Sequence, residues 1–249
     1  MPFYICPALR IAANKENCKI VYYHISTDFY PSMDIPENAY ILYPDYFGVC
    51  SHIVEELSLK YKNLIVDNAH SFFSKPKGIA SFASLRKFFP TLRDGSFLYK
   101  TSGFEIEEFS QDDFSYIPKY LSYEEFSKNE NRLNSQDIKY ISQSTLQAYS
   151  LIDLEEEKIK RRELFNYFND YFNGDYKLKS EQVPMAYPYL AKNSNDAQKI
   201  ASELQQKNIN VYRYWNNLPE SYSERKLYEN LLVICLNVDE FISGGFRSE

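Results

Sequence analysis

The stretch Leu64-Ile65-Val66-Asp67 sets the pattern from which the fold is predicted, because it is a short apolar run that ends in a carboxylate. Similar runs alternate with polar helical stretches, such as Ile53 to Tyr61, through roughly the first hundred residues. The predicted strands lie at residues 20–23, 40–43, 64–67, 79–82 and 96–99. This β-α-β rhythm predicts an α/β fold with a mainly parallel sheet sandwiched by helices. Such sheets bind ligands at the carboxyl ends of their strands, where Asp67 is expected.

The second half of the chain predicts a helical region and then a small α/β domain. Residues 134–172 have a helical pattern, and Asn173-Gly174 supplies a stop. The three-and-four spacing of a buried helix face is followed by Leu164, Phe165, Phe168, Tyr171 and Phe172. We expect one long helix or two consecutive ones there. The later elements are predicted as strands at 186–190, 211–212 and 231–236, with a helix that begins at an N-cap within 194–196. The predicted domains are a large one over residues 1–174, connecting helix included, and a small C-terminal one over residues 175–249.

The composition argues against several classes of function. The 249 residues are 44% apolar and carry a net charge of −6, without a block of lysine and arginine. Nucleic-acid-binding proteins need a basic face, so no nucleic-acid partner is expected. No apolar run approaches the roughly 20 residues of a membrane span, and no signal-peptide pattern is present, so we predict a cytoplasmic protein with no membrane partner. Residues 104–121 are acidic and aromatic without clear periodicity and indicate no function.

The cysteines and histidines do not indicate a metal site. The four cysteines form no Cys-x-x-Cys pair, which argues against a zinc site and a disulfide framework. The three histidines lack the spacing of metal ligands. The residues concerned are Cys6, Cys18, Cys50, Cys235, His24, His52 and His70. We therefore predict no metal.

Asp67 and Lys87 together predict a pyridoxal phosphate site. Lys87 lies in the segment that follows the next predicted strand. Its amine can form a Schiff base with the cofactor's aldehyde, while the carboxylate faces the pyridine nitrogen and keeps it protonated. Taken singly, a residue such as Asp67 is more often a turn former, and one such as Lys87 is more often a solvated lysine. The prediction therefore depends on their combination.

The neighbours of Lys87 favour a reactive amine. Leu85, Phe88 and Phe89 surround it in the sequence, and Arg86 precedes it. Partial burial and a cationic neighbour both favour the neutral amine, which is the nucleophilic form.

Other residues near this pair are candidates for contacts with the cofactor. His70 follows the strand end and can reach the phenolic oxygen or the ring face. Ser81 or Ser84 can donate a hydroxyl to the phosphate. Gly95 can let the backbone pass close to a bound ring. For Tyr4, stacking on the ring and plain packing are both open.

Three runs of the sequence carry a resemblance to a known family. They extend from Leu64 to Ser71, from Phe82 to Pro90 and from Asp94 to Ser96. They resemble the DegT/DnrJ/StrS-type aminotransferases, in particular members from lipopolysaccharide and capsule biosynthesis, which carry an Asp-x-Ala-His strand end and a Ser-x-Arg-Lys segment before a glycine turn. Weaker similarities lie at residues 2–7, 46–48, 183–190 and 214–215.

The resemblance implies the fold-type I architecture of pyridoxal phosphate enzymes. Lys87 would be the Schiff-base lysine, Asp67 the partner of the pyridine nitrogen, and His70 a second ring contact. Lys87 would also move a proton during transamination. The substrates would be a nucleotide-linked keto sugar and an amino-acid donor such as glutamate. The family works as homodimers with the active site at the subunit interface.

The chain departs from the family at both ends. The motif matched by residues 2–7 follows Met1 directly, so we expect the family's phosphate-binding Gly-Thr or Gly-Ser turn to have no counterpart and the large domain to be incomplete. Residues 241–249 stop where the family adds a final helix. An alternative interpretation is therefore an inactive homologue, a partner subunit or a remnant. A sugar dehydratase is disfavoured because such enzymes replace the lysine with histidine.

Overall fold

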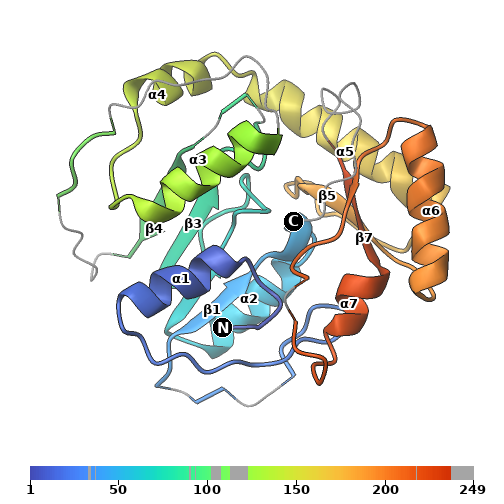
Figure 1. Cartoon of the computed structure of the whole chain (residues 1–249), viewed down its shortest axis with the longest axis horizontal. Coiled ribbons are helices and arrows are strands. Elements are labelled where there is room, and N and C mark those ends of the chain that lie inside the picture. Colours follow the sequence, from blue (N-terminus) through green and yellow to red (C-terminus); the bar gives the residue numbers. More distant parts are fainter. Residues whose placement is uncertain are drawn as a thin grey trace.

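The computed structural model shows an α/β protein built around two β-sheets (Figure 1). It describes residues 1–32, 35–36, 38–89, 91–92, 94–101, 108–112, 123–216 and 218–236, with only the backbone of 123–127. Most of the segment 104–121 and all of 241–249 lie outside these residues. Within the described part, no helix combines the length and the apolar character needed to cross a membrane.

The first sheet has four strands and is mostly parallel. Its strands are β1 (Ile41–Pro44), β2 (Leu64–Asp67), β3 (Ala80–Ser84) and β4 (Ser96–Lys100), in the order β1-β2-β3-β4. The β1–β2 and β2–β3 pairs are parallel, whereas β4 runs antiparallel to β3. The sequence therefore predicted these four strands and the mainly parallel sheet correctly.

The strand predicted at residues 20–23 does not form. Only Tyr23 makes an isolated bridge, to Pro2, and its hydroxyl donates to the carbonyl of Leu42 at 2.8 Å. Val21 leaves 58% of its surface exposed. The prediction was wrong because this apolar run contacts the first sheet through the side chain of Tyr23 and does not pair its backbone with a strand of that sheet.

The helices of this part of the chain are α1 (Pro7–Lys15), α2 (Ser51–Lys60), α3 (Tyr123–Ser135), α4 (Gln143–Ser150) and α5 (Leu154–Tyr171), with a short 3₁₀ turn, η1, at Tyr46–Gly48. Of these, α2 packs on β2 of the first sheet, and α5 packs on β5 of the second. The predicted helical region 134–172 is divided into the end of α3 and all of α4 and α5. The divisions follow capping, since Ser142 and Asp153 accept hydrogen bonds from the first turns of α4 and α5.

The stop predicted after α5 is confirmed. Asn173 adopts the left-handed conformation with φ of 51°, and the amide of Gly174 donates to the carbonyl of Asn169 at 2.7 Å. A left-handed residue directly after the last turn lets the chain leave the helix while its final carbonyls keep donors.

The second sheet lies in the C-terminal part. It contains β5 (Ala186–Leu190), β6 (Val211–Tyr212) and β7 (Leu231–Cys235) in the antiparallel order β5-β7-β6, with helices α6 (Ser194–Gln206) and α7 (Arg225–Asn230). All three predicted strands are present. The N-cap of α6 is Asn193, one residue before the predicted position, because its side-chain oxygen accepts the amide of Asp196 at 3.0 Å. Helix α7 was not predicted.

One hydrophobic cluster runs through both sheets. It joins Ile41, Leu64 and Val66 of the first sheet to Tyr187 and Val233 of the second. The division into domains at residue 174 stays a prediction.

A buried arginine connects the two sheets through α5. Arg161 is fully buried, and its Nη1 donates to the carbonyl of Met185 at 3.1 Å while its Nη2 donates to the carbonyl of Phe88 at 2.6 Å. Its Nε pairs with Glu157 at 2.6 Å, and the guanidinium lies over the Phe88 ring. The planar fork of arginine reaches three acceptors at once, which lysine cannot do.

We expect Arg161→Lys and Arg161→Ala to destabilise the protein by roughly 3–5 kcal/mol, because either change leaves buried carbonyls or a buried charge without a partner. Urea unfolding followed by circular dichroism measures this. Arg162→Ala is the neighbouring control. Equal losses for the two alanine variants would contradict a special role of Arg161.

Candidate functional site

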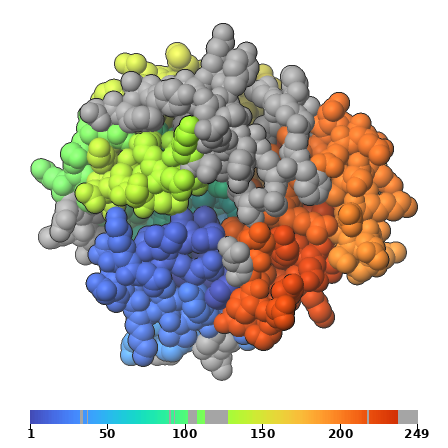
Figure 2. Space-filling view, in the orientation of Figure 1, coloured from blue at the N-terminus to red at the C-terminus, as the bar shows by residue number. Residues whose placement is uncertain are grey.

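A cavity of about 420 Å³ opens at the carboxyl ends of the parallel strands. Pro44, Asp67 and Ser84, which end β1, β2 and β3, all line it. The start of α1 and the last turns of α3 form its sides, and Figure 2 shows teal atoms of the sheet region between the blue N-terminal part and the yellow-green α3. The volume is within the usual range for small-molecule sites.

The strand register selects which side chains face this cavity. Asp67 pairs with Phe82, and side chains alternate between the two faces of a strand. Asp67, Phe82 and Ser84 therefore share the cavity face, and all three line the cavity. Ser81 points to the opposite, core face and is fully buried there. Of the two serines predicted as phosphate ligands, Ser84 lines the cavity and Ser81 does not, and the phosphate contact itself stays a prediction.

All four predicted site residues line this one cavity. They are Asp67, His70, Ser84 and Lys87. The amine and the carboxylate thus face a common space, which is the geometric condition that the sequence prediction required.

Burial makes Asp67 an unusual carboxylate. Only 7% of its surface is exposed, and its Oδ1 accepts the amide of Ala69 at 2.8 Å. Desolvation raises its pKa to about 6, against the lowering effects of the Ala69 amide and the charge of Lys87. Asp45, whose pKa burial also raises to about 6, adds to the effect. A desolvated carboxylate of this kind favours a cationic partner inside the cavity.

His70 packs in an aromatic cluster at the cavity wall. Its ring is stacked with Phe47 at a centroid distance of 5.3 Å and is parallel to Trp215 at 5.7 Å. Desolvation and the charge of Lys87 hold its pKa well below 6.5, so the imidazole is neutral. Its buried Nδ1 has no hydrogen-bond partner among the residues that the structure describes.

Gly48 allows the η1 turn to support His70. Its φ is +77°, and a Cβ there would lie 2.7 Å from the carbonyl oxygen of His70 and 2.9 Å from Cα of Pro184. Only glycine combines this conformation with so close an approach.

Lys87 is half-buried in the turn after β3, as predicted from its apolar neighbours. Its ammonium lies 5.6 Å from the ring centroid of Tyr214. Leu85, Phe88 and Phe89 are buried beneath the turn. This anchoring directs the lysine toward the cavity that Asp67 and His70 share.

Two weaker predictions are corrected. Tyr4 is fully buried, packs edge-on against Trp215 at 4.7 Å and is not among the cavity residues, so its role is packing. Gly95 has a φ of +92°, but a Cβ there would meet the side chains of Ile141 and Leu85 and not the cavity. A glycine is required at position 95 because the packed side chains of Ile141 and Leu85 leave no room for a Cβ.

Sequence reasoning missed several residues of the cavity wall. Trp215 and Asn216 come from the chain after β6, and Glu130 and Asn134 come from α3. Arg86 was noted only as a neighbour of Lys87, yet it lines the cavity. Its position in the Arg-Lys pair was the one signal available, because long-range packing brings the others in.

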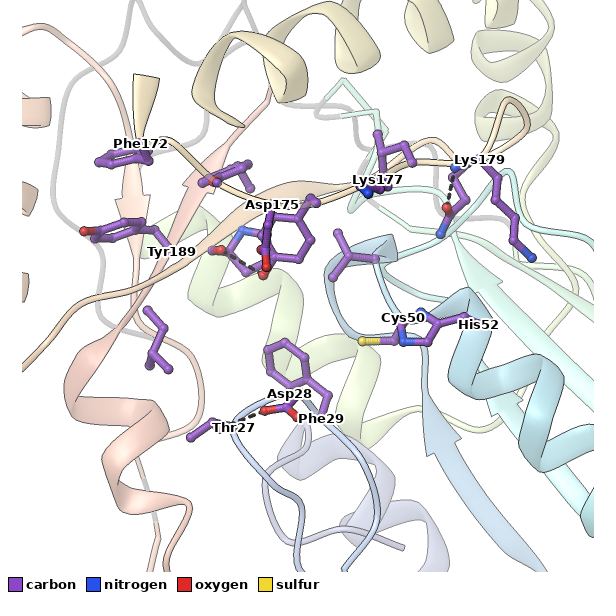
Figure 3. A pocket seen from close by; sticks show the side chains of 18 of the residues that line it. Thr27, Asp28, Phe29, Cys50, His52, Phe172, Asp175, Lys177, Lys179 and Tyr189 are labelled. Carbon is purple, nitrogen blue, oxygen red and sulfur yellow. Dashed lines mark hydrogen bonds between the residues drawn. The ribbon is translucent and has the colours of Figure 1, made fainter. Parts of the chain in front are cut away.

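A second, larger cavity of about 870 Å³ has a different character. Its wall contains the exposed side chains of Asp28, His52, Asp175, Lys177 and Lys179 (Figure 3). None of the predicted site residues lines this cavity. The smaller cavity, which they do line, is therefore the better candidate for chemistry.

No protein-family model matches the chain, and a search of curated proteins finds no similar sequence. The residues of the cavity are therefore the structural basis for assigning a function.

The pKa of Asp67 predicts a pH-dependent stability. A folded pKa of about 6 lies above the ordinary value of 3.8, so the ionised form is disfavoured in the fold and stability increases as pH falls from above 6 to below 4. We expect Asp67→Asn to raise the free energy of unfolding at pH 8 by about 2 kcal/mol and to reduce this pH dependence, leaving the part due to Asp45. Urea titrations at pH 8, 6 and 4 measure both effects.

The exposed Asp137→Asn serves as the control for these titrations. A pH profile that is the same in Asp67→Asn and in the parent would show that burial does not perturb this carboxyl.

Proposed function

We propose that this chain is a pyridoxal-phosphate-dependent aminotransferase of the fold-type I class. Its substrates would be a nucleotide-linked keto sugar and an amino-acid donor such as glutamate. The observation that carries the proposal is the shared cavity of Asp67 and Lys87 at the carboxyl ends of a mostly parallel sheet. The resemblance in the Asp67 and Lys87 segments adds the substrate class and the place in lipopolysaccharide or capsule biosynthesis.

The donor set of the cavity fits the cofactor. Asp67 would hold the pyridine nitrogen, since a desolvated carboxylate gains most from a cationic N–H. His70, whose buried Nδ1 has no partner among the described residues, would contact the phenolic oxygen or the ring. Ser84 offers a hydroxyl to the phosphate, and Lys87 an amine to the aldehyde.

When bound, pyridoxal phosphate supplies an aldehyde and an electron-withdrawing ring. Asp67 keeps a proton at the ring nitrogen because its carboxylate, removed from water, is stabilised by that charge. Lys87 Nζ would accept the proton from the α-carbon of the amino donor and deliver it to the cofactor's C4′ carbon within the same half-reaction, and the second half-reaction would reverse this transfer on the keto sugar. His70 stays neutral and so adds no positive charge that would compete with the ring.

The outer wall of the cavity suits a hydroxyl-rich substrate. Ser96, Asn134 and Asn216 line it. Their hydroxyl and amide groups both donate and accept hydrogen bonds, as sugar hydroxyls require. Trp215 adds an apolar surface on which a sugar ring can pack. A homodimer is part of the proposal through the family resemblance.

Covalent capture tests the assignment of Lys87. On mixing with pyridoxal phosphate, we expect a new absorbance band, and borohydride reduction should fix the cofactor to the peptide that contains Lys87. Lys87→Ala should lose the band and the mass increase, because the alanine has no amine. Lys179→Ala, at an exposed lysine, should keep both. Adducts spread over surface lysines in the parent protein would sink the aminotransferase assignment and favour the inactive homologue.

Asp67→Asn tests the electronic role of the carboxylate. We expect it to bind the cofactor but to slow the transfer step by about 10²–10³-fold, because the amide cannot hold the ring proton by charge. Single-turnover rates with glutamate measure this step, and Asp137→Asn is the matched control. An undiminished rate would contradict the role given to Asp67.

A further inference from the structure

Arg86 stands out because it lines the cavity and is not used in the function proposed above. It precedes Lys87 in the turn after β3, and 24% of its side chain is exposed. Among the described cavity residues, the basic side chains are Arg86, Lys87 and His70, and His70 is neutral. A guanidinium in a concave site is suited to a phosphate or carboxylate.

In this structure Glu130 of α3 contacts the guanidinium. Arg86 Nη1 lies 2.7 Å from Glu130 Oε1, and Nη2 donates to Oε2 at 3.2 Å. The short contact is a charge contact with poor direction, because the buried Oε1 has no hydrogen bond among the described residues. The pair therefore makes one well-directed hydrogen bond, whereas a bidentate pair of arginine and carboxylate makes two.

Helix α3 is also held by ion pairs other than the one between Arg86 and Glu130. Two residues after Glu130, Arg132 contacts Asp94 at 3.3 Å and Asp112 at 3.1 Å. Asp94 is itself held by the Thr145 hydroxyl at 2.6 Å. Glu130 can thus release Arg86 by a change of side-chain rotamer while the helix stays in place.

We propose that Arg86 is the anion subsite of this cavity, that it receives a phosphoryl group of the bound ligand, and that Glu130 occupies it as a built-in competitor when no ligand is present. A phosphoryl group offers three strong acceptors to a fork that Glu130 satisfies only in part. Ser84, on the same wall, adds a hydroxyl. The two possible sources of this phosphoryl group, the cofactor and the sugar nucleotide, are taken from the proposed function, and this inference rests on it.

Comparison of pyridoxal phosphate with pyridoxal tests the subsite. The readout is the concentration of each aldehyde that half-saturates the reducible adduct at Lys87. We expect Arg86→Gln to weaken the binding of pyridoxal phosphate by about 10- to 100-fold and to leave the binding of pyridoxal unchanged. Glu130→Gln should strengthen the binding of pyridoxal phosphate by several-fold, with no effect on the binding of pyridoxal. Arg86→Lys should fall between the parent and Arg86→Gln, because it keeps charge but loses the fork.

Matched controls come from exposed ion pairs elsewhere. Glu55→Gln breaks a pair with Lys77 at 2.9 Å, and Arg225→Gln breaks one with Glu229 at 3.1 Å. Neither should change the preference for the phosphorylated aldehyde. Urea unfolding shows that each variant is folded before binding is compared.

Two further ligands test Arg86 without any reaction at Lys87. Inorganic phosphate and uridine diphosphate should each raise the unfolding temperature of Lys87→Ala, and the added Arg86→Gln change should remove the increase. If the binding of pyridoxal phosphate depends on Arg86, the subsite belongs to the cofactor. If only the binding of the nucleotide depends on Arg86, the subsite belongs to the sugar substrate. The proposed subsite is overturned if Arg86→Gln weakens the binding of no phosphorylated ligand. It is also overturned if Glu130→Gln strengthens the binding of none. Absence of an adduct from both aldehydes removes the proposed function alone.

Discussion

The site depends on the buried guanidinium of Arg161. It joins α5 to the Phe88 carbonyl in the turn that carries Lys87, and to the Met185 carbonyl at the start of β5. A charge removed from water is tolerated only where its donors are used, so these contacts specify one arrangement of helix, turn and second sheet. The contact to Phe88 thereby anchors the turn that carries Lys87, while the register of β2 and β3 places Asp67 beside it.

Burial then gives the cavity its chemical character at a cost in stability. Asp67 loses solvation that only one backbone amide and a nearby lysine offset, which raises its pKa to about 6. The same removal from water keeps His70 neutral. A protein optimised for stability alone would have an amide or an apolar residue at position 67. A buried carboxylate that lowers stability is typical of a functional site.

The sequence predicted those parts of the structure that local physics controls. The run Leu64 to Asp67 is apolar and bounded, which predicts a buried strand. Residues 20–23 have the same pattern but form no strand, because only tertiary packing decides whether an apolar run is paired. The Arg86–Glu130 contact joins residues 44 positions apart and leaves no local signal. The contact between Trp215 and His70 likewise joins residues far apart in the chain and leaves no local signal in the sequence.

Taken alone, the sequence determined an α/β chain in which a carboxylate ends one strand and a lysine follows the next. Spacing along two adjacent parallel strands suffices for that, since their carboxyl ends meet at one edge. Tertiary structure decided which hydroxyl faces the cavity, which aromatic rings surround His70, and which carboxylate contacts Arg86. These depend on strand register and on long-range packing, where displacement by a single residue would turn the same side chains to the other face.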